Sequence, residues 1–166
     1  HEQAAAVYIR NKDSSGLASY YNERALGFSK NQSFDSAEVY FNKGLTLARA
    51  TDDGLMQADI LSSLGLTYKK QKRYKEALEL LKLALYLGPK YYNTPDYLAA
   101  LYNNLGAGYM VNNMYDSAMQ AFHTSIEYSI TSGSAPSEME NYRNLGQLYE
   151  AMHLPDSQLL YIKKYY

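Results

Sequence analysis

The 166-residue sequence contains no cysteine and no tryptophan, and only four prolines. Without cysteine, disulfides, thiolate zinc sites and cysteine nucleophiles are excluded, while the redox compartment stays open. No apolar run approaches the roughly 18 residues typical of a membrane span, so we expect no direct membrane contact. Sixteen basic residues against seventeen acidic ones leave a net charge of −1, which argues against nucleic acid as a partner.

Motifs for catalysis are missing as well. The three histidines stand at positions 1, 123 and 153, and none belongs to a His-Glu-x-x-His motif. The sequence has neither a glycine-rich phosphate loop nor a nucleophile elbow. We therefore predict that the protein is not an enzyme, and that it has no catalytic residues, no metal site and no cofactor.

What the sequence does contain is a repeat of about 40 residues. The dipeptide Leu-Gly recurs at 64–65, 105–106 and 145–146, and each glycine is followed three residues later by tyrosine. The steps between these motifs are 41 and 40 residues. A weaker copy in the same frame lies one period earlier, which makes four copies.

Each copy reads as two antiparallel helices, because apolar residues recur every three or four positions and the pattern breaks at short polar turns. The predicted turns lie near residues 31–32, 71–72, 112–113 and 153–154. Gly65 and Gly106 fall inside the first helix of their copies, where glycine costs about 1 kcal/mol relative to alanine. We attribute these glycines to close approach by the second helix, at Ala77 and Ala118.

These residues resemble the tetratricopeptide repeat (TPR) family, whose helix–turn–helix unit carries Leu-Gly-x-x-Tyr followed by alanine, an aromatic residue and often a proline. The resemblance covers essentially the whole chain. It implies an all-α fold, a right-handed α-α superhelix of four helix–turn–helix repeats with an N-terminal half repeat. The period exceeds the usual 34 residues and is similar to the longer-helix class of kinesin light chains and many bacterial signalling proteins.

The resemblance also implies how the chain is organised. We expect a single array with a half repeat at 1–16 and repeats at 17–53, 54–93, 94–134 and 135–166. Uncapped arrays tend to be insoluble, so we expect this chain to be a fragment of a longer one. Its exposed ends would then allow self-association.

In the TPR family the first helices of the repeats line a concave groove that receives extended peptides or partner helices. The resemblance places ten candidate peptide-binding residues there: Asn22, Ser62, Lys69, Asn103, Asn104, Ala107, Met110, Arg143, Asn144 and Gln147. The Lys/Asn clamp by which chaperone adaptors grip a terminal carboxylate is absent, which argues against a co-chaperone role.

Asn104 and Asn144 come directly before Leu-Gly, where some TPR superhelices use asparagine to bind the backbone of a peptide. An asparagine amide offers both a donor and an acceptor. We predict that an extended peptide binds between the third and fourth copies, near the apolar patch around Met110. The alternative is that these asparagines join neighbouring first helices to each other.

Charge is spread unevenly along the chain. Residues 91–162 carry seven acidic residues and one arginine, a sum of −6, whereas residues 1–90 carry 13 basic and 10 acidic residues, a sum of +3. Such asymmetry affects partner orientation and association rate more than fold. The basic stretch at 69–75 is either a solvated turn or a site for an acidic peptide or a phosphate.

We predict that the protein acts by non-covalent recognition of a protein or peptide ligand. Tyr-Asp-Ser-Ala at 115–118, Phe-Asp-Ser-Ala at 34–37 and the ending at 161–166 resemble TPR regions of bacterial sensor histidine kinases and transcriptional regulators. That resemblance implies a sensory or regulatory input module in signal transduction, periplasmic in a sensor kinase and otherwise cytoplasmic. The alternative is a free-standing scaffold or adaptor that assembles a multiprotein complex.

Overall fold

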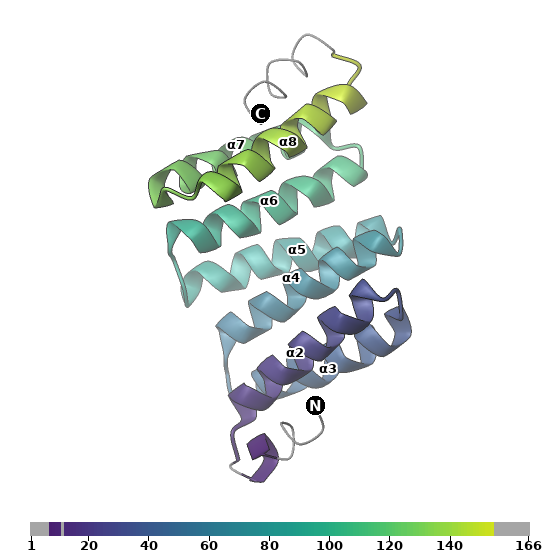
Figure 1. Cartoon of the computed structure of the whole chain (residues 1–166), viewed down its shortest axis with the longest axis vertical. Coiled ribbons are helices and arrows are strands. Elements are labelled where there is room, and N and C mark those ends of the chain that lie inside the picture. Colours follow the sequence, from purple (N-terminus) through teal and green to yellow (C-terminus); the bar gives the residue numbers. More distant parts are fainter. Residues whose placement is uncertain (1–6, 11, 155–166) are drawn as a thin grey trace. The chain divides into compact units, whose positions relative to one another are not determined.

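The computed structural model describes residues 7–10 and 12–154 of the chain, and residues 7–10 are helical. The further elements are α2 (Ser14–Lys30), α3 (Phe34–Ala50), α4 (Gly54–Lys70), α5 (Tyr74–Leu87), η1 (Gly88–Lys90), α6 (Pro95–Val111), α7 (Tyr115–Ser132) and α8 (Ala135–Ala151). Within each part of the chain on either side of residue 91, consecutive helices form hairpins joined by short turns (Figure 1). The predicted all-α fold of helix–turn–helix repeats is confirmed.

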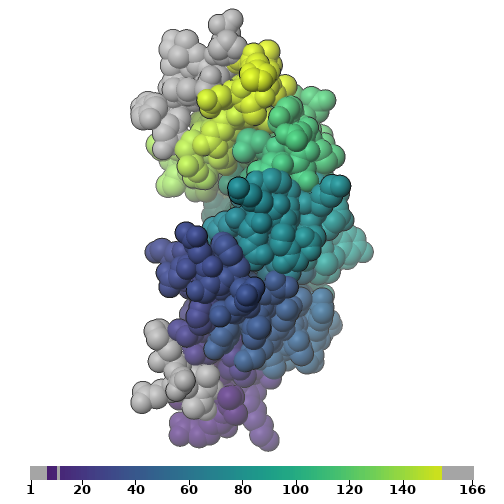
Figure 2. All heavy atoms as spheres, turned by 90° about the vertical axis from the view of Figure 1, so that its right-hand side faces the viewer, coloured from purple at the N-terminus to yellow at the C-terminus, as the bar shows by residue number. Residues whose placement is uncertain are grey.

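The chain divides into two compact units, residues 1–91 and residues 92–166. In the first unit α2 packs on α3, α4 packs on α5, and α4 also contacts α2 and α3. In the second unit α8 packs on both helices of the α6–α7 pair. In the space-filling view the heavy atoms of each unit form a closely packed outer face (Figure 2).

Some predictions fall outside the described residues. They concern the start of the half repeat at 1–6, the second helix of the fourth copy and the ending at 161–166. The predicted repeat boundaries and self-association through the array ends therefore stay predictions.

Six turns that follow helices share one backbone geometry. Each of these six contains a residue other than glycine with a φ between 52° and 62°, namely Lys12, Gln32, Asp52, Lys72, Asn113 or His153, whereas the turn between α7 and α8 has Gly133 at a φ of 72°. The N–H of the following residue donates to a carbonyl five residues back, as from Arg73 to Tyr68 at 3.0 Å. This bond satisfies a carbonyl at the end of the helix and reverses the chain within about three residues. Four of these turns lie where the break in the apolar pattern predicted them.

Two glycines lie where paired helices come close, as expected, but the contacting atoms differ from the prediction. A Cβ atom at Gly106 would lie 2.6 Å from Cε1 of Phe122. At Gly65 it would lie 3.0 Å from Cγ of Leu81 and 3.2 Å from the carbonyl oxygen of Ala77. The large side chain one turn after the alanine is therefore the main partner, because it reaches across the helix pair where a methyl group does not.

Candidate functional site

A cleft of about 250 Å³ lies between α6 and α8 in the second unit. Its polar lining consists of Asn103 and Asn104 from α6 and Ser137, Glu140 and Asn141 from α8, beside two alanines and a proline. Both helices are the first helices of their repeats, so the cleft lies where the family resemblance places a ligand groove. Its walls offer hydrogen-bond donors and acceptors from both sides.

A hydrogen bond crosses from α8 to α6 near this cleft. Nδ2 of Asn144 donates to Oδ1 of Asn103 at 2.7 Å, and Asn144 is only 8% exposed. This is the contact that the alternative interpretation describes, in which asparagines join neighbouring helices. Asn104 is half-buried and lines the cleft. Contact of Asn104 and Asn144 with a peptide stays a prediction.

Arg143 lies one turn after Glu140 on α8 and forms an ion pair with it. The side chains are 44% and 48% exposed, so the pair is solvated and contributes little to stability. Because Glu140 lines the cleft, the pair places a carboxylate, partly neutralised by Arg143, at the wall of the cleft.

The other predicted groove residues of the second unit differ in exposure. Ala107 is 8% exposed and belongs to the core around Phe122 and Leu145, against which Met110 also packs. Gln147 is exposed on α8. Ala107 and Met110 therefore contribute to helix packing, and Ala107 leaves little surface for a ligand.

Three predicted groove residues belong to the first unit. On α2, Asn22 is half-buried, and its Oδ1 accepts no hydrogen bond within the described part of the chain. On α4, Ser62 is 8% exposed and Lys69 is half-buried. The first unit has its own cleft of about 470 Å³ on α2, lined by aromatic residues that include Tyr8 and Phe28.

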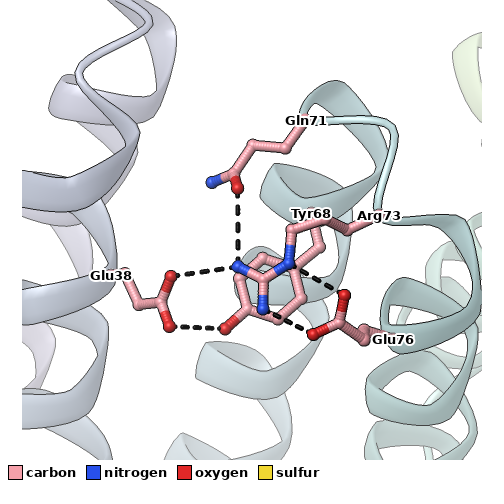
Figure 3. A network of polar contacts seen from close by, with 5 residues as sticks. All are labelled: Glu38, Tyr68, Gln71, Arg73 and Glu76. Atoms are coloured by element: carbon pink, nitrogen blue, oxygen red, sulfur yellow. Dashed lines mark hydrogen bonds and ion pairs between the residues drawn. The ribbon is translucent and has the colours of Figure 1, made fainter.

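The basic stretch at 69–75 forms a structural junction (Figure 3). The Arg73 guanidinium donates to Glu76 on α5 at 2.5 and 2.9 Å and to Glu38 on α3 at 3.2 Å. It also lies 3.6 Å from the centroid of the Tyr68 ring on α4. Arg73 thereby joins three helices, whereas Lys70 is exposed.

Three pKa values at this junction are displaced, and the hydrogen bond to Glu76 raises that of the Arg73 guanidinium. Burial, together with the hydrogen bond from the hydroxyl of Tyr68 to Glu38, raises the pKa of Tyr68 above its usual value. The hydrogen bond from Arg73 lowers the pKa of the Glu76 carboxyl. Tyr68 is therefore held in its neutral form and Glu76 in its charged form.

Asn141 was not among the residues predicted from the sequence, although it lines the cleft. The signal is in the repeat register, because position 141 corresponds to Ile60 and Leu101 in the preceding copies. The fourth copy therefore has an amide where the second and third copies have an aliphatic side chain.

The described residues lack two other features. Across residues 7–10 and 12–154, no three acidic or histidine side chains are grouped so that they could hold a metal ion. In the same ranges, no helix has both the length and the apolar character that a membrane span requires.

Comparison with known proteins connects these features to a family. Residues 16–87 match the family model of the tetratricopeptide repeat. No curated protein matches the sequence.

Solved structures share the fold at low sequence identity. BtubC from P. vanneervenii superposes with a TM-score of 0.80 at 17% identity, over 92% of this chain and 63% of BtubC. A Podosopora anserina protein described as a kinesin light chain with nearly identical TPR-like repeats gives 0.77 at 16% identity, over 99% of this chain and 81% of that one. MamA superposes with a TM-score of 0.60 at 21% identity, over 97% of this chain and 91% of MamA.

At these identities the likeness to solved structures shows the fold alone, and this chain spans just under two thirds of the length of BtubC. The family model covers α2 to α5, and the Leu-Gly-x-x-Tyr motif continues in register through α6 and α8. Residues 16–87 are therefore assigned to the tetratricopeptide repeat family, and the second unit resembles that family in its repeat motif.

Proposed function

We propose that this protein recognises a protein or peptide segment non-covalently, and that the α6–α8 cleft is its binding site in the second unit. TPR arrays generally act as protein-interaction modules. The observation that carries the proposal is the cleft itself, in which amide side chains of two consecutive first helices face one another. We propose binding rather than catalysis, with no cofactor.

The chemistry of the lining suits an extended backbone. A peptide offers alternating N–H and C=O groups, and each asparagine amide offers both complementary groups. Asn103 and Asn104 therefore bind a backbone without regard to its side chains, while Met110 supplies an apolar contact next to the core. Arg143 and Gln147 on α8 extend this surface.

The proposal is tested by panning a library of random capped dodecapeptides on the protein and measuring the selected peptides by calorimetry. The variant Asn104→Ala/Asn144→Ala is expected to weaken binding by roughly tenfold or more, since about two hydrogen bonds are lost. Asn42→Ala, at an exposed position of α3 in the other unit, serves as the control. Unchanged affinity in the double variant, with its fold intact by circular dichroism, would refute the proposed site.

At a finer level, we propose that this binding serves as the sensory or regulatory input of a bacterial signalling protein. The motifs at 34–37 and 115–118 support this through their resemblance to TPR regions of sensor kinases and regulators. The compartment follows from the class: periplasmic for a sensor kinase and cytoplasmic for a regulator.

A free-standing adaptor is the second candidate, and one observation favours it. Each unit has a cleft of its own, about 470 Å³ on α2 and about 250 Å³ between α6 and α8, so two ligands could bind at once. Sequencing the native gene through both ends decides between the candidates. A membrane helix with a kinase or DNA-binding region supports the input module, and a stop codon after one further amphipathic helix supports the adaptor.

A further inference from the structure

Asn141 occupies a core position of its repeat. The residue four places before the Leu-Gly motif is Ile60 in the second copy and Leu101 in the third, and they are 0% and 5% exposed. Asn141 holds the same position in the fourth copy and is 1% exposed. One of the most buried side chains of the second unit is therefore an amide in an aliphatic position.

The hydrogen bonds of Asn141 are incomplete. Nδ2 donates to the carbonyl oxygen of Ser137 at 2.8 Å, which fixes the orientation of the amide. Oδ1 is almost completely buried and accepts no hydrogen bond from the described residues. Buried side-chain oxygens are nearly always hydrogen-bonded, so an exception calls for a physical explanation.

The surroundings of Asn141 favour a positively charged donor. Asn141 lines the α6–α8 cleft together with Glu140, the charged residue of the lining. Residues 92–154 carry six acidic residues and a single arginine, Arg143, which is paired with Glu140. An unused acceptor in a region of net negative charge attracts a cation more strongly than a neutral donor.

We propose that the α6–α8 cleft binds a basic side chain, lysine or arginine, of the peptide that occupies the groove. Its N–H groups donate to Oδ1 of Asn141 and to the carboxylate of Glu140. Lysine and arginine carry donors and no acceptor, so they complement this lining, whereas an acidic side chain is repelled. A cleft of about 250 Å³ accommodates one such side chain. The inference rests on the peptide-binding function proposed above.

The test uses Nα-acetyl-lysine N-methylamide and its norleucine analogue, which lacks the ammonium group. Titration of ¹⁵N-labelled protein is followed through the side-chain amide signals of Asn103, Asn104 and Asn141. The lysine probe is expected to shift these signals saturably and to bind roughly tenfold tighter than the norleucine probe. Equal binding of the two probes, or binding of neither, would overturn the inference.

Two variants sharpen the test. Asn141→Leu restores an aliphatic residue like those at positions 60 and 101, and it is expected to lose roughly tenfold in affinity for the lysine probe while its melting temperature stays equal or rises. Arg143→Gln frees Glu140 and is expected to tighten binding roughly two- to fivefold. If Asn141→Leu binds the lysine probe like the wild type, water satisfies the amide oxygen and the inference is wrong.

The selected dodecapeptides separate this inference from the proposed function. Each peptide is remade with norleucine in place of its lysines and arginines. Peptides that need Asn104 but tolerate this replacement overturn the basic-side-chain inference and leave the proposed function standing. Failure of every peptide to bind overturns both.

Discussion

The guanidinium of Arg73 lies 3.6 Å from the centroid of the Tyr68 ring, while both residues bind the same carboxylate, that of Glu38. The hydroxyl of Tyr68 donates to one carboxylate oxygen at 2.7 Å, and Nη1 of Arg73 donates to the other at 3.2 Å. Helices α3, α4 and α5 thus meet at three side chains (Figure 3).

Arg73→Ala should lower the free energy of unfolding by about 1–2 kcal/mol, since it removes the stacking contact and the hydrogen bonds of a partly solvated side chain. Urea unfolding followed by circular dichroism measures the effect. Lys70→Ala, at an exposed position of the same basic stretch, is the control and should change stability by less than about 0.5 kcal/mol. Equal losses in the two variants would contradict the role assigned to Arg73.

Tyr68→Phe should lower the free energy of unfolding at neutral pH. This difference from the wild type should become smaller at alkaline pH. The pKa of Tyr68 is raised in the folded state by burial and by Glu38, so the unfolded chain ionises first as the pH rises through about 10. Wild-type stability from this group is therefore complete below pH 10 and declines above it. Urea unfolding of both proteins from pH 8 to 10.5 should show that the difference in their free energies of unfolding becomes smaller as the pH rises. A difference that stays constant would refute the raised pKa of Tyr68.

Asn103 and Asn144 should be energetically coupled, because the bond of 2.7 Å between them joins α6 to α8 and is partly buried. A double-mutant cycle with alanine at each position should give a coupling of about 1 kcal/mol in the free energy of unfolding. Additive effects of the two substitutions would show that the bond does not stabilise the unit.

Two glycine-to-alanine substitutions should change the free energy of unfolding in opposite directions. Gly106→Ala places a methyl group 2.6 Å from the Phe122 ring, and such overpacking costs about 1–3 kcal/mol. Gly27→Ala adds a methyl group with no atom within 4 Å and should stabilise α2 by about 0.5–1 kcal/mol. Thermal unfolding of the two variants measures both effects. A change of melting temperature in the same direction in both variants would contradict the close approach at Gly106.

The sequence by itself determined the helix pairs, because amphipathic periodicity and helix-ending turns act over a few residues and are visible in any one repeat. The Leu-Gly register also placed Asn103, Asn104 and Asn144 on first helices, and the structure brings Asn103 and Asn144 into contact. The turn at 71–72 lies where the apolar pattern breaks, and Lys72 adopts a positive φ there.

Only the tertiary structure decided which polar groups are satisfied. The partners of Arg73 and Tyr68 include Glu38 on another helix, 35 and 30 residues away, and no local pattern encodes that pairing. In the same way, the repeat register places Asn141 at an aliphatic position, but only the folded second unit shows that its Oδ1 is buried without a hydrogen-bond partner among the described residues. Hydrogen bonding depends on distance and direction in space, whereas helix formation depends mainly on neighbours along the chain.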